Sequence, residues 1–285
     1  MGHLLSQGEI KELLPENEGG GLSGEVHLVR HNGQKYVLRK CDTYLRAARY
    51  ETYAKKFAKY HFLPKFLGRE GKNIFLEFIE GRDLTSNDSG RYLEQVGAIA
   101  AHINNSRSFG RMDFRFMKQV NELISGKYSY SGNVDVRRYR DDSKADKRRI
   151  KALFSTEEGK EIKNLYKTLK REAKPKIMLD TNDISPNNYR LRNGRVYLVD
   201  IEALKARIKG FGIAKCFTRW AITQKQQEAF RKGYDSVSSM DFYQGSYEGL
   251  CNLMFLVQTL NYKAQIGRDY RTDLKRLDDL LRQKI

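Results

Sequence analysis

KIMLDTNDISPNNYRLRNGRVYLVDIEALK, residues Lys176 to Lys205, is the stretch that decides the fold. It begins with an apolar run and continues into a polar loop that carries Asp183 and Asn188. The dipeptide Asn193-Gly194 suits the two positive-φ positions of a tight hairpin turn. We therefore predict a strand on either side of this turn, which together return the chain from the loop to Asp200.

The predicted ribbon gathers two acidic residues and one amide. A hairpin of this length would hold Asp183, Asn188 and Asp200 near one point. Carboxylate and amide oxygens are the hard ligands that Mg²⁺ prefers, and an aspartate can also act as a base. The stretch therefore suits a phosphate ester with its metal ion.

The pattern Asp183-x-x-x-x-Asn188, followed by Asp200-Ile-Glu202, resembles the catalytic loop and metal-binding aspartate of the protein-kinase-like superfamily. It is most similar to the aminoglycoside phosphotransferase and choline kinase branch. That branch usually has His-Gly-Asp in the loop, whereas this chain has Thr181-Asn182-Asp183. The resemblance implies that Asp183 is the catalytic base for the acceptor hydroxyl, and that Asn188 and Asp200 bind Mg²⁺.

A glycine-rich stretch near the start of the chain supplies a second element. Its residues match the kinase loop G-x-G-x-x-G-x-V, with Gly19, Gly21, Gly24 and Val26 at the fixed positions. Glycines are required there because the backbone must bend sharply and approach the phosphates closely. The stretch continues as a strand, a turn at Asn32-Gly33 and a second strand. This order favours the ATP-covering ribbon of a kinase over a dinucleotide-binding fold.

The second strand should carry the cation that pairs with the α- and β-phosphates. Its candidates are Arg39 and Lys40, and alternation allows only one of them to face the nucleotide. We favour Arg39, because Arg often fills this place in the branch that the chain resembles. A helix is predicted over residues 42–60, and the resemblance implies that its Glu51 orients the strand cation. The alternative is a surface Glu51 paired with Lys55 one turn on.

The strand predicted to end at Ile79 leads into Glu80-Gly81, which resembles the linker between kinase lobes. The resemblance implies that backbone groups from Glu77 to Ile79 hydrogen-bond the adenine of ATP. We therefore expect an α+β, two-lobed protein-kinase-like fold. A small antiparallel-sheet lobe would cover residues 1–81 and a larger, mostly helical lobe residues 82–285.

The composition suits a globular protein whose charge is strongly positive. The formal net charge is +18, which attracts anions such as nucleic acid, acidic lipid or phosphorylated compounds. The three cysteines are isolated, so we expect reduced residues of a cytoplasmic protein. No apolar run is long enough to span a bilayer, and the first residues show no signal-peptide pattern.

Much of the charge lies in a predicted helical insertion. Residues 107–176 hold 20 Lys and Arg against 10 Asp and Glu. The centre of this segment, residues 137–149, mixes basic residues with tyrosine, a combination that can neutralise phosphates and stack on bases. The alternative is an amphipathic insertion with a solvated basic face.

Together these elements predict transfer of the γ-phosphoryl group of ATP, with Mg²⁺, to a hydroxyl group. The leading acceptor is small and anionic or sugar-like, because a polycationic aminoglycoside fits poorly near the basic residues 203–209. One alternative is a kinase of macromolecules, RNA first and protein second, that docks its substrate on residues 107–176. Another is an inactive kinase fold used as a binding module, against which the intact Asp183, Asn188 and Asp200 argue.

Overall fold

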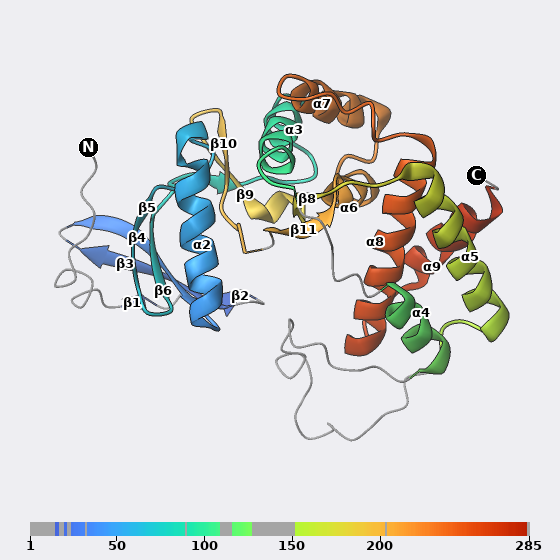
Figure 1. Cartoon of the computed structure of the whole chain (residues 1–285). Helices are drawn as coiled ribbons and strands as arrows, with labels where there is room; N and C mark the ends of the chain where they lie inside the picture. The colour runs from blue at the N-terminus through green and yellow to red at the C-terminus, as the bar shows by residue number, and fades with distance from the viewer. Residues whose placement is uncertain are drawn as a thin grey trace.

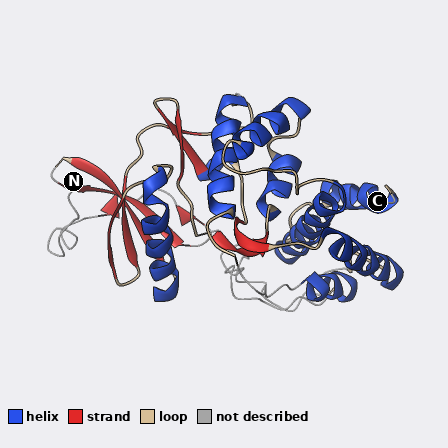
Figure 2. Cartoon of the chain, turned by 45° about the horizontal axis from the view of Figure 1, so that its top comes forward, coloured by secondary structure: helices blue, strands red, loops and turns tan. Residues whose placement is uncertain are grey.

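The computed structural model describes residues 15–16, 20–21, 24–31, 33–88, 90–108, 116–126, 152–202 and 204–283. In this part of the chain, most strands gather at one end of the molecule with a single long helix, and the other helices fill the opposite end (Figure 1, Figure 2). The predicted α+β architecture with two lobes is confirmed.

The small lobe is an antiparallel sheet that α2 covers. The strand order is β1-β3-β4-β6-β5, and β2 also pairs with β3. The elements are β1 (Pro15–Glu16), β2 (Gly20–Gly21), β3 (Gly24–His31), β4 (Gln34–Cys41), α2 (Tyr44–Phe57), β5 (Phe66–Glu70) and β6 (Asn73–Glu77). Strands β3 and β4 form the predicted hairpin, with Gly33 at a φ of 74° in its turn.

Alternation along β4 separates the two faces of this sheet. Leu38 packs with Val29 and Phe75 in a small apolar cluster on one face. Cys41 joins the main core on the other face, where α2 packs. Arg39 lies two residues before Cys41 and is therefore directed to the α2 side, although it is charged.

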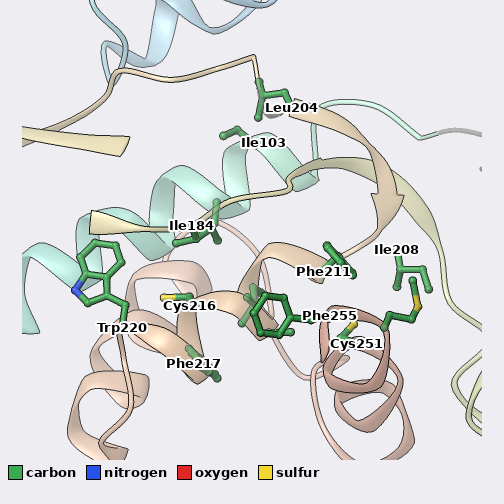
Figure 3. Packing of buried hydrophobic residues seen from close by; sticks show 14 of the residues in the cluster. Ile103, Ile184, Leu204, Ile208, Phe211, Cys216, Phe217, Trp220, Cys251 and Phe255 are labelled. Carbon is green, nitrogen blue, oxygen red and sulfur yellow. The ribbon is translucent and has the colours of Figure 1, made fainter. Parts of the chain in front are cut away.

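The large lobe is built around helix α8. The helices are α3 (Gly90–Asn104), α4 (Phe116–Ser125), α5 (Thr156–Ala173), α6 (Phe211–Arg219), α7 (Gln224–Asp235), α8 (Gly245–Ile266) and α9 (Arg271–Arg282). Helix α8 packs against α4, α5, α6 and α9, so most of its surface is buried. Figure 3 shows Cys216 and Cys251 among the aromatic and aliphatic side chains of this core. Both are free and buried, as is Cys41.

Five short strands connect the two ends of the molecule. They are β7 (Arg82–Asp83), β8 (Ile177–Thr181), β9 (Tyr189–Arg192), β10 (Arg195–Leu198) and β11 (Leu204–Ile208). One sheet has the order β10-β9-β7, and β11 pairs with β8 in another. Asn193 and Gly194 both have positive φ, 51° and 76°, as the predicted turn between β9 and β10 requires.

Two predicted features lie outside the described residues, namely Gly19 and the basic centre of the insertion at 137–149. The predicted insertion 107–176 is described at residues 107–108, 116–126 and 152–176, where it supplies α4 and α5 to the large lobe. None of the helices that the structure describes is long and apolar enough to cross a membrane.

Candidate active site

Strand β8 and the β9–β10 hairpin bring the predicted loop residues together. Asn188 ends a short 3-10 helix, η4 (Pro186–Asn188), and its Nδ2 donates to the main-chain oxygen of Asp183 at 2.9 Å. The main-chain amide of Val199 donates to the oxygen of Asn188, also at 2.9 Å. Asp200 follows directly. The hairpin therefore closes the chain on itself and sets Asp183, Asn188 and Asp200 around one point.

Arg39 crosses from the small lobe to the acidic end of this hairpin. Its Nη2 lies 3.2 Å from Oδ1 of Asp200, and its Nε donates to Oε1 of Glu202 at 2.9 Å. The main-chain amide of Glu202 donates to the same Asp200 oxygen at 3.0 Å. The Arg39 side chain is only 9% exposed. The pair with Glu202 is thus shielded from water, whereas Asp200 is partly exposed, and the two ion pairs together join the two lobes.

The environment keeps Arg39 charged. Burial alone would lower the pKa of its guanidinium, but the charges of Asp200 and Glu202 raise this pKa above its ordinary value. The ring of Tyr50 adds a cation–π contact, with its centre 5.7 Å from Cζ of Arg39. Lys40 lies on the opposite face of β4 and is exposed. Of the two candidate cations, the structure therefore directs Arg39 to the predicted metal residues.

The predicted pairing of Glu51 with the strand cation is wrong in this structure. Glu51 accepts from Lys55 and from Arg69, each at 2.6 Å, on the outer side of α2. The preceding residue, Tyr50, is the one that faces Arg39, and a helix turns about 100° per residue, so Glu51 is directed away. The carboxylate that holds Arg39 comes instead from Glu202.

Asp183 has two side-chain partners that the sequence did not predict. The hydroxyl of Ser185 donates to Oδ1 of Asp183, and Nζ of Lys215 forms an ion pair with the same oxygen. Lys215 comes from α6, one helical turn after the start of that helix. The side chains of Asp183 and Lys215 are 36% and 28% exposed, so this pair faces solvent at the surface of the site.

Asp180 positions α6 against the loop that carries Asp183. Its carboxylate accepts from the main-chain amides of Gly210 and Gly212 at the start of α6, both at 2.8 Å. It also accepts from Nδ2 of Asn104, on α3, at 2.7 Å. Burial raises the pKa of Asp180 to about 6. A Cβ at Gly212 would lie 1.8 Å from the oxygen of Thr181, so only glycine allows α6 to approach β8 this closely.

The glycine-rich stretch forms a narrow ribbon at the edge of the small lobe. Gly21 of β2 is paired with Gly24 of β3, which leaves two residues for the turn. Further along β3, Val26 is paired with Arg39 of β4 and is half-buried. The ribbon therefore ends beside the strand cation, as the kinase-like pattern requires. The part played by Gly21, Gly24 and Val26 in nucleotide binding remains a prediction.

The backbone amides of the linker after β6 differ in whether they already donate a hydrogen bond within the protein. The amide of Glu77 donates to the oxygen of Lys65 at 2.9 Å, and its side chain lies 3.1 Å from Arg192. Ile79 is buried, and among the described residues no backbone hydrogen bond uses its amide. The structure thus commits the Glu77 amide to the fold, whereas the Ile79 amide stays available for the predicted contact with adenine.

The proposed magnesium ligands have the chemistry that this ion requires. Within the described part of the chain, Oδ2 of Asp200 and Oδ1 of Asn188 accept no hydrogen bond, since each side chain uses its other polar atom. Both are hard oxygen donors. No group of three His, Cys, Asp or Glu side chains that could hold a metal occurs among the described residues. Phosphate oxygens would have to complete the coordination, as is usual for Mg²⁺.

Some site residues were not predicted from the sequence, and they differ in how strongly the local sequence indicates them. Glu202 lies two positions after Asp200, and in an extended segment such residues share a face, so its participation had a local signal. Lys215 and Asp180 had none, because their partners lie about 30 residues away across the β8–α6 contact. Ser185 follows Asp183 closely, but a serine at that spacing is common in loops.

Comparison with known proteins gives a fold but no close relative. No protein-family model matches the chain, and no curated protein matches it in sequence. Choline kinase LicA from Streptococcus pneumoniae superposes with a TM-score of 0.63 at 16% identity, over 96% of this chain and 95% of that one. LicA has also been solved with AMP.

Two further structures agree. An ethanolamine kinase from Plasmodium vivax has a TM-score of 0.63 at 12% identity, over 99% of this chain and 86% of that one. An aminoglycoside phosphotransferase from Alicyclobacillus acidocaldarius has a TM-score of 0.57 at 12% identity, over 99% and 92%. The chain therefore has the two-lobed fold that these kinases and phosphotransferases share, and the predicted fold and structural resemblance are confirmed.

Proposed function

We propose that the chain is an ATP- and Mg²⁺-dependent phosphotransferase that moves the γ-phosphoryl group of ATP to a hydroxyl of a small acceptor. The observation that carries this proposal is the bonding of Arg39 to Asp200 and Glu202, next to Asn188 and Asp183. This arrangement would bring together a cation for the α- and β-phosphates, two metal ligands and a base. The kinase and phosphotransferase folds among the structural neighbours support it, as does the AMP complex of one of them.

Each residue has a defined task in this reaction. Arg39, held by two carboxylates, would pair with the α- and β-phosphates, and the glycine ribbon would cover them. Asn188 and Asp200 would hold Mg²⁺, which neutralises the charge that develops on the phosphate oxygens. Asp183 would orient the acceptor hydroxyl and accept its proton.

Lys215 and Ser185 would fix the direction of the Asp183 carboxylate. Both donors contact Oδ1, which leaves the second carboxylate oxygen for the acceptor. The ammonium of Lys215 would also offset charge on the transferred phosphoryl group. Because the Asp183–Lys215 pair is partly exposed to solvent, it would contribute little to stability, which favours a catalytic role for Asp183 over a structural one.

The acceptor is proposed to be sugar-like or anionic. The loop is bordered by cations on two sides, with Lys215 bonded to Asp183 and Arg207 bonded to the neighbouring Asn182. Such surroundings repel a cationic acceptor and attract an anionic one. RNA or protein as acceptor, and an inactive binding module, become outcomes of the test that follows.

The test is transfer of labelled γ-phosphate from ATP to a fractionated extract and to a panel of sugars, sugar acids, choline and an aminoglycoside. We expect label in a small anionic or sugar fraction. Asp183→Asn should lower turnover by about 10²- to 10⁴-fold and retain ATP binding. Asp241→Asn, which changes an exposed aspartate far along the chain, is the matched control.

Other outcomes would replace the proposal. Equal turnover by Asp183→Asn and the wild type would remove Asp183 from the chemistry. Label in RNA or protein would establish the macromolecular acceptor. ATP binding by the wild type with no transfer to any fraction would establish a binding module.

A further inference from the structure

Strand β11 carries a positively charged face beside the catalytic loop. Lys205 and Arg207 share one face, because side chains two residues apart on a strand point the same way. On the other face, Leu204 and Ile208 are buried in the core. Strand β11 pairs with β8, and Nε of Arg207 donates to Oδ1 of Asn182 at 3.1 Å. The charged face therefore adjoins the residue before Asp183.

Helix α2 of the small lobe brings two further cations to this place. Its Tyr50 lies against Arg39, which bonds Glu202 just before β11 starts. Arg46 precedes Tyr50 by one helical turn, and Arg49 lies three residues after Arg46 on the same side of α2. Both are close enough to Lys205 of β11 for their charges to act on it. We call Arg46, Arg49, Lys205 and Arg207 the α2–β11 cluster.

Lys205 lies at the centre of this cluster. It is half-buried, and its pKa is lowered, first by burial and then by the positive charges of Arg207, Arg46 and Arg49. Glu202 is the acid that acts in the opposite direction. Arg46 pairs with Asp42. Among the ion pairs of the described residues, none includes Lys205 or Arg49. Counted over the described residues, positive charges from both lobes therefore meet here in excess of the acids.

We propose that the α2–β11 cluster binds a phosphate group, at a site separate from that of the ATP phosphates. A phosphate dianion can accept from guanidinium and ammonium groups at the same time, so it matches a cluster that mixes Arg and Lys. Bound there, it offsets the mutual repulsion of the four cations and ties α2 to β11. The ATP phosphates, by contrast, belong to the glycine ribbon and Arg39.

The phosphate has two possible sources with the same chemistry. It is carried either by the acceptor, which would then be a phosphorylated hydroxyl compound, or by a separate phosphate anion that stabilises the closed arrangement of the lobes. The assignment of this phosphate to the acceptor rests on the proposed phosphotransferase function. The binding of phosphate to the cluster is independent of that function.

Thermal unfolding tests the binding site. The full chain is saturated with Mg²⁺ and a non-hydrolysable ATP analogue, and its Tm is compared in inorganic phosphate and in chloride of equal ionic strength. The same pair of buffers is used without nucleotide. We expect phosphate to raise Tm above the chloride value in both series, because the cluster stays open when the nucleotide site is filled.

Two double variants locate the effect. Arg49→Gln/Lys205→Gln should weaken the apparent phosphate affinity about tenfold or more, since it removes two charged donors. Arg91→Gln/Lys225→Gln, which removes the same charges from exposed positions of α3 and α7, should keep the wild-type response. In chloride the first variant should melt no lower than the wild type, because it relieves repulsion. Arg49→Gln alone, at an exposed position, provides the same test with less change to the fold.

Some results would overturn the site. An equal response of the wild type, Arg49→Gln and Arg49→Gln/Lys205→Gln to phosphate would mean that the cluster does not bind it. A phosphate response that the nucleotide analogue abolishes would place the phosphate in the ATP site instead.

Labelled ATP then separates the two sources. Label entering a hexose phosphate, with a KM about tenfold higher in Arg49→Gln/Lys205→Gln and an unchanged kcat, identifies the acceptor phosphate. Turnover on another acceptor that inorganic phosphate raises identifies a separate anion. The absence of any turnover would count against the proposed function alone, because the unfolding measurements decide the binding site without it.

Discussion

Arg39 and Lys205 are two largely buried cations near Glu202, but their charges are balanced differently. Arg39 is bonded to Asp200 and to Glu202, so its charge is matched inside the protein. Lys205 is surrounded by further cations and forms no ion pair among the described residues. A cation with its own carboxylates belongs to the framework of the site. Cations that lie close together, with fewer acids beside them among the described residues, support the proposed phosphate ligand.

The largest effect is expected from removing Arg39, the cation that is paired with carboxylates. Arg39→Met would leave Asp200 and Glu202 in a shielded site without their cation. We expect the free energy of unfolding to fall by about 3–5 kcal/mol, measured by urea denaturation, because removal of one partner strands the other charges. Arg49→Gln, from the unmatched side, should change it by about 0.5 kcal/mol or less. Similar losses in the two variants would erase the distinction between matched and crowded cations.

Asp180 is the acidic counterpart, a buried carboxylate whose direct donors are neutral groups. Burial raises its pKa to about 6, above the value of about 3.9 expected for an unfolded chain. The folded state therefore favours the protonated form. The stabilising contribution of Asp180 should be complete below pH 4 and be lost as the pH rises through 6. By pH 7 the loss should amount to about 3 kcal/mol.

The comparison with Asp180→Asn isolates this term from the other titrating groups. Urea denaturation of both proteins between pH 4 and pH 7.5 gives the difference in unfolding free energy at each pH. That difference should shift in favour of the variant as the pH rises. A constant difference would show that the amides of Gly210 and Gly212 fully stabilise the charged form of Asp180.

Lys215 is a cation in direct contact with the proposed base, Asp183, and should therefore affect the reaction more than the fold. Lys215→Met removes the ammonium from Asp183, and we expect a decrease of kcat of about 10- to 100-fold. Lys215→Arg should recover part of it, because the charge returns with a different shape. Both variants should unfold within about 1 kcal/mol of the wild type, since the pair faces solvent. A lower Tm with an unchanged kcat would assign Lys215 to structure only.

Local patterns in the sequence predicted the parts of the site that local geometry controls. The turn at Asn193-Gly194, the strand–turn–strand after the glycines and the spacing of Asp183 and Asn188 all depend on neighbouring residues, and all occur in the structure. The choice between Arg39 and Lys40 depended on the phase of one strand. Packing of β4 against α2 fixed that phase.

The sequence could not predict contacts that arise only when distant elements pack. Strand β11 is short and carries charged residues on one face, so its pairing with β8 has little local signal. That pairing nevertheless places Arg207 beside Asn182, in the loop proposed to be catalytic. Likewise, the contact of Lys215 with Asp183 depends on the start of α6 being held by Asp180. The role predicted for Glu51 came from the family resemblance. That resemblance does not specify which side chains of α2 face Arg39, and in the structure Tyr50 faces it.

Glu51 provides the smallest expected effect and the sharpest test of this orientation of α2. It is matched to Lys55 and Arg69 at the surface, where ion pairs contribute about 0–1 kcal/mol. Glu51→Gln should therefore leave the KM for ATP unchanged, whereas Glu202→Gln should raise it by about tenfold or more, because Glu202 holds Arg39 directly. Steady-state kinetics of the two variants decide the matter. A loss of ATP affinity in Glu51→Gln as large as in Glu202→Gln would mean that α2 turns during the reaction and returns the helix acid to Arg39.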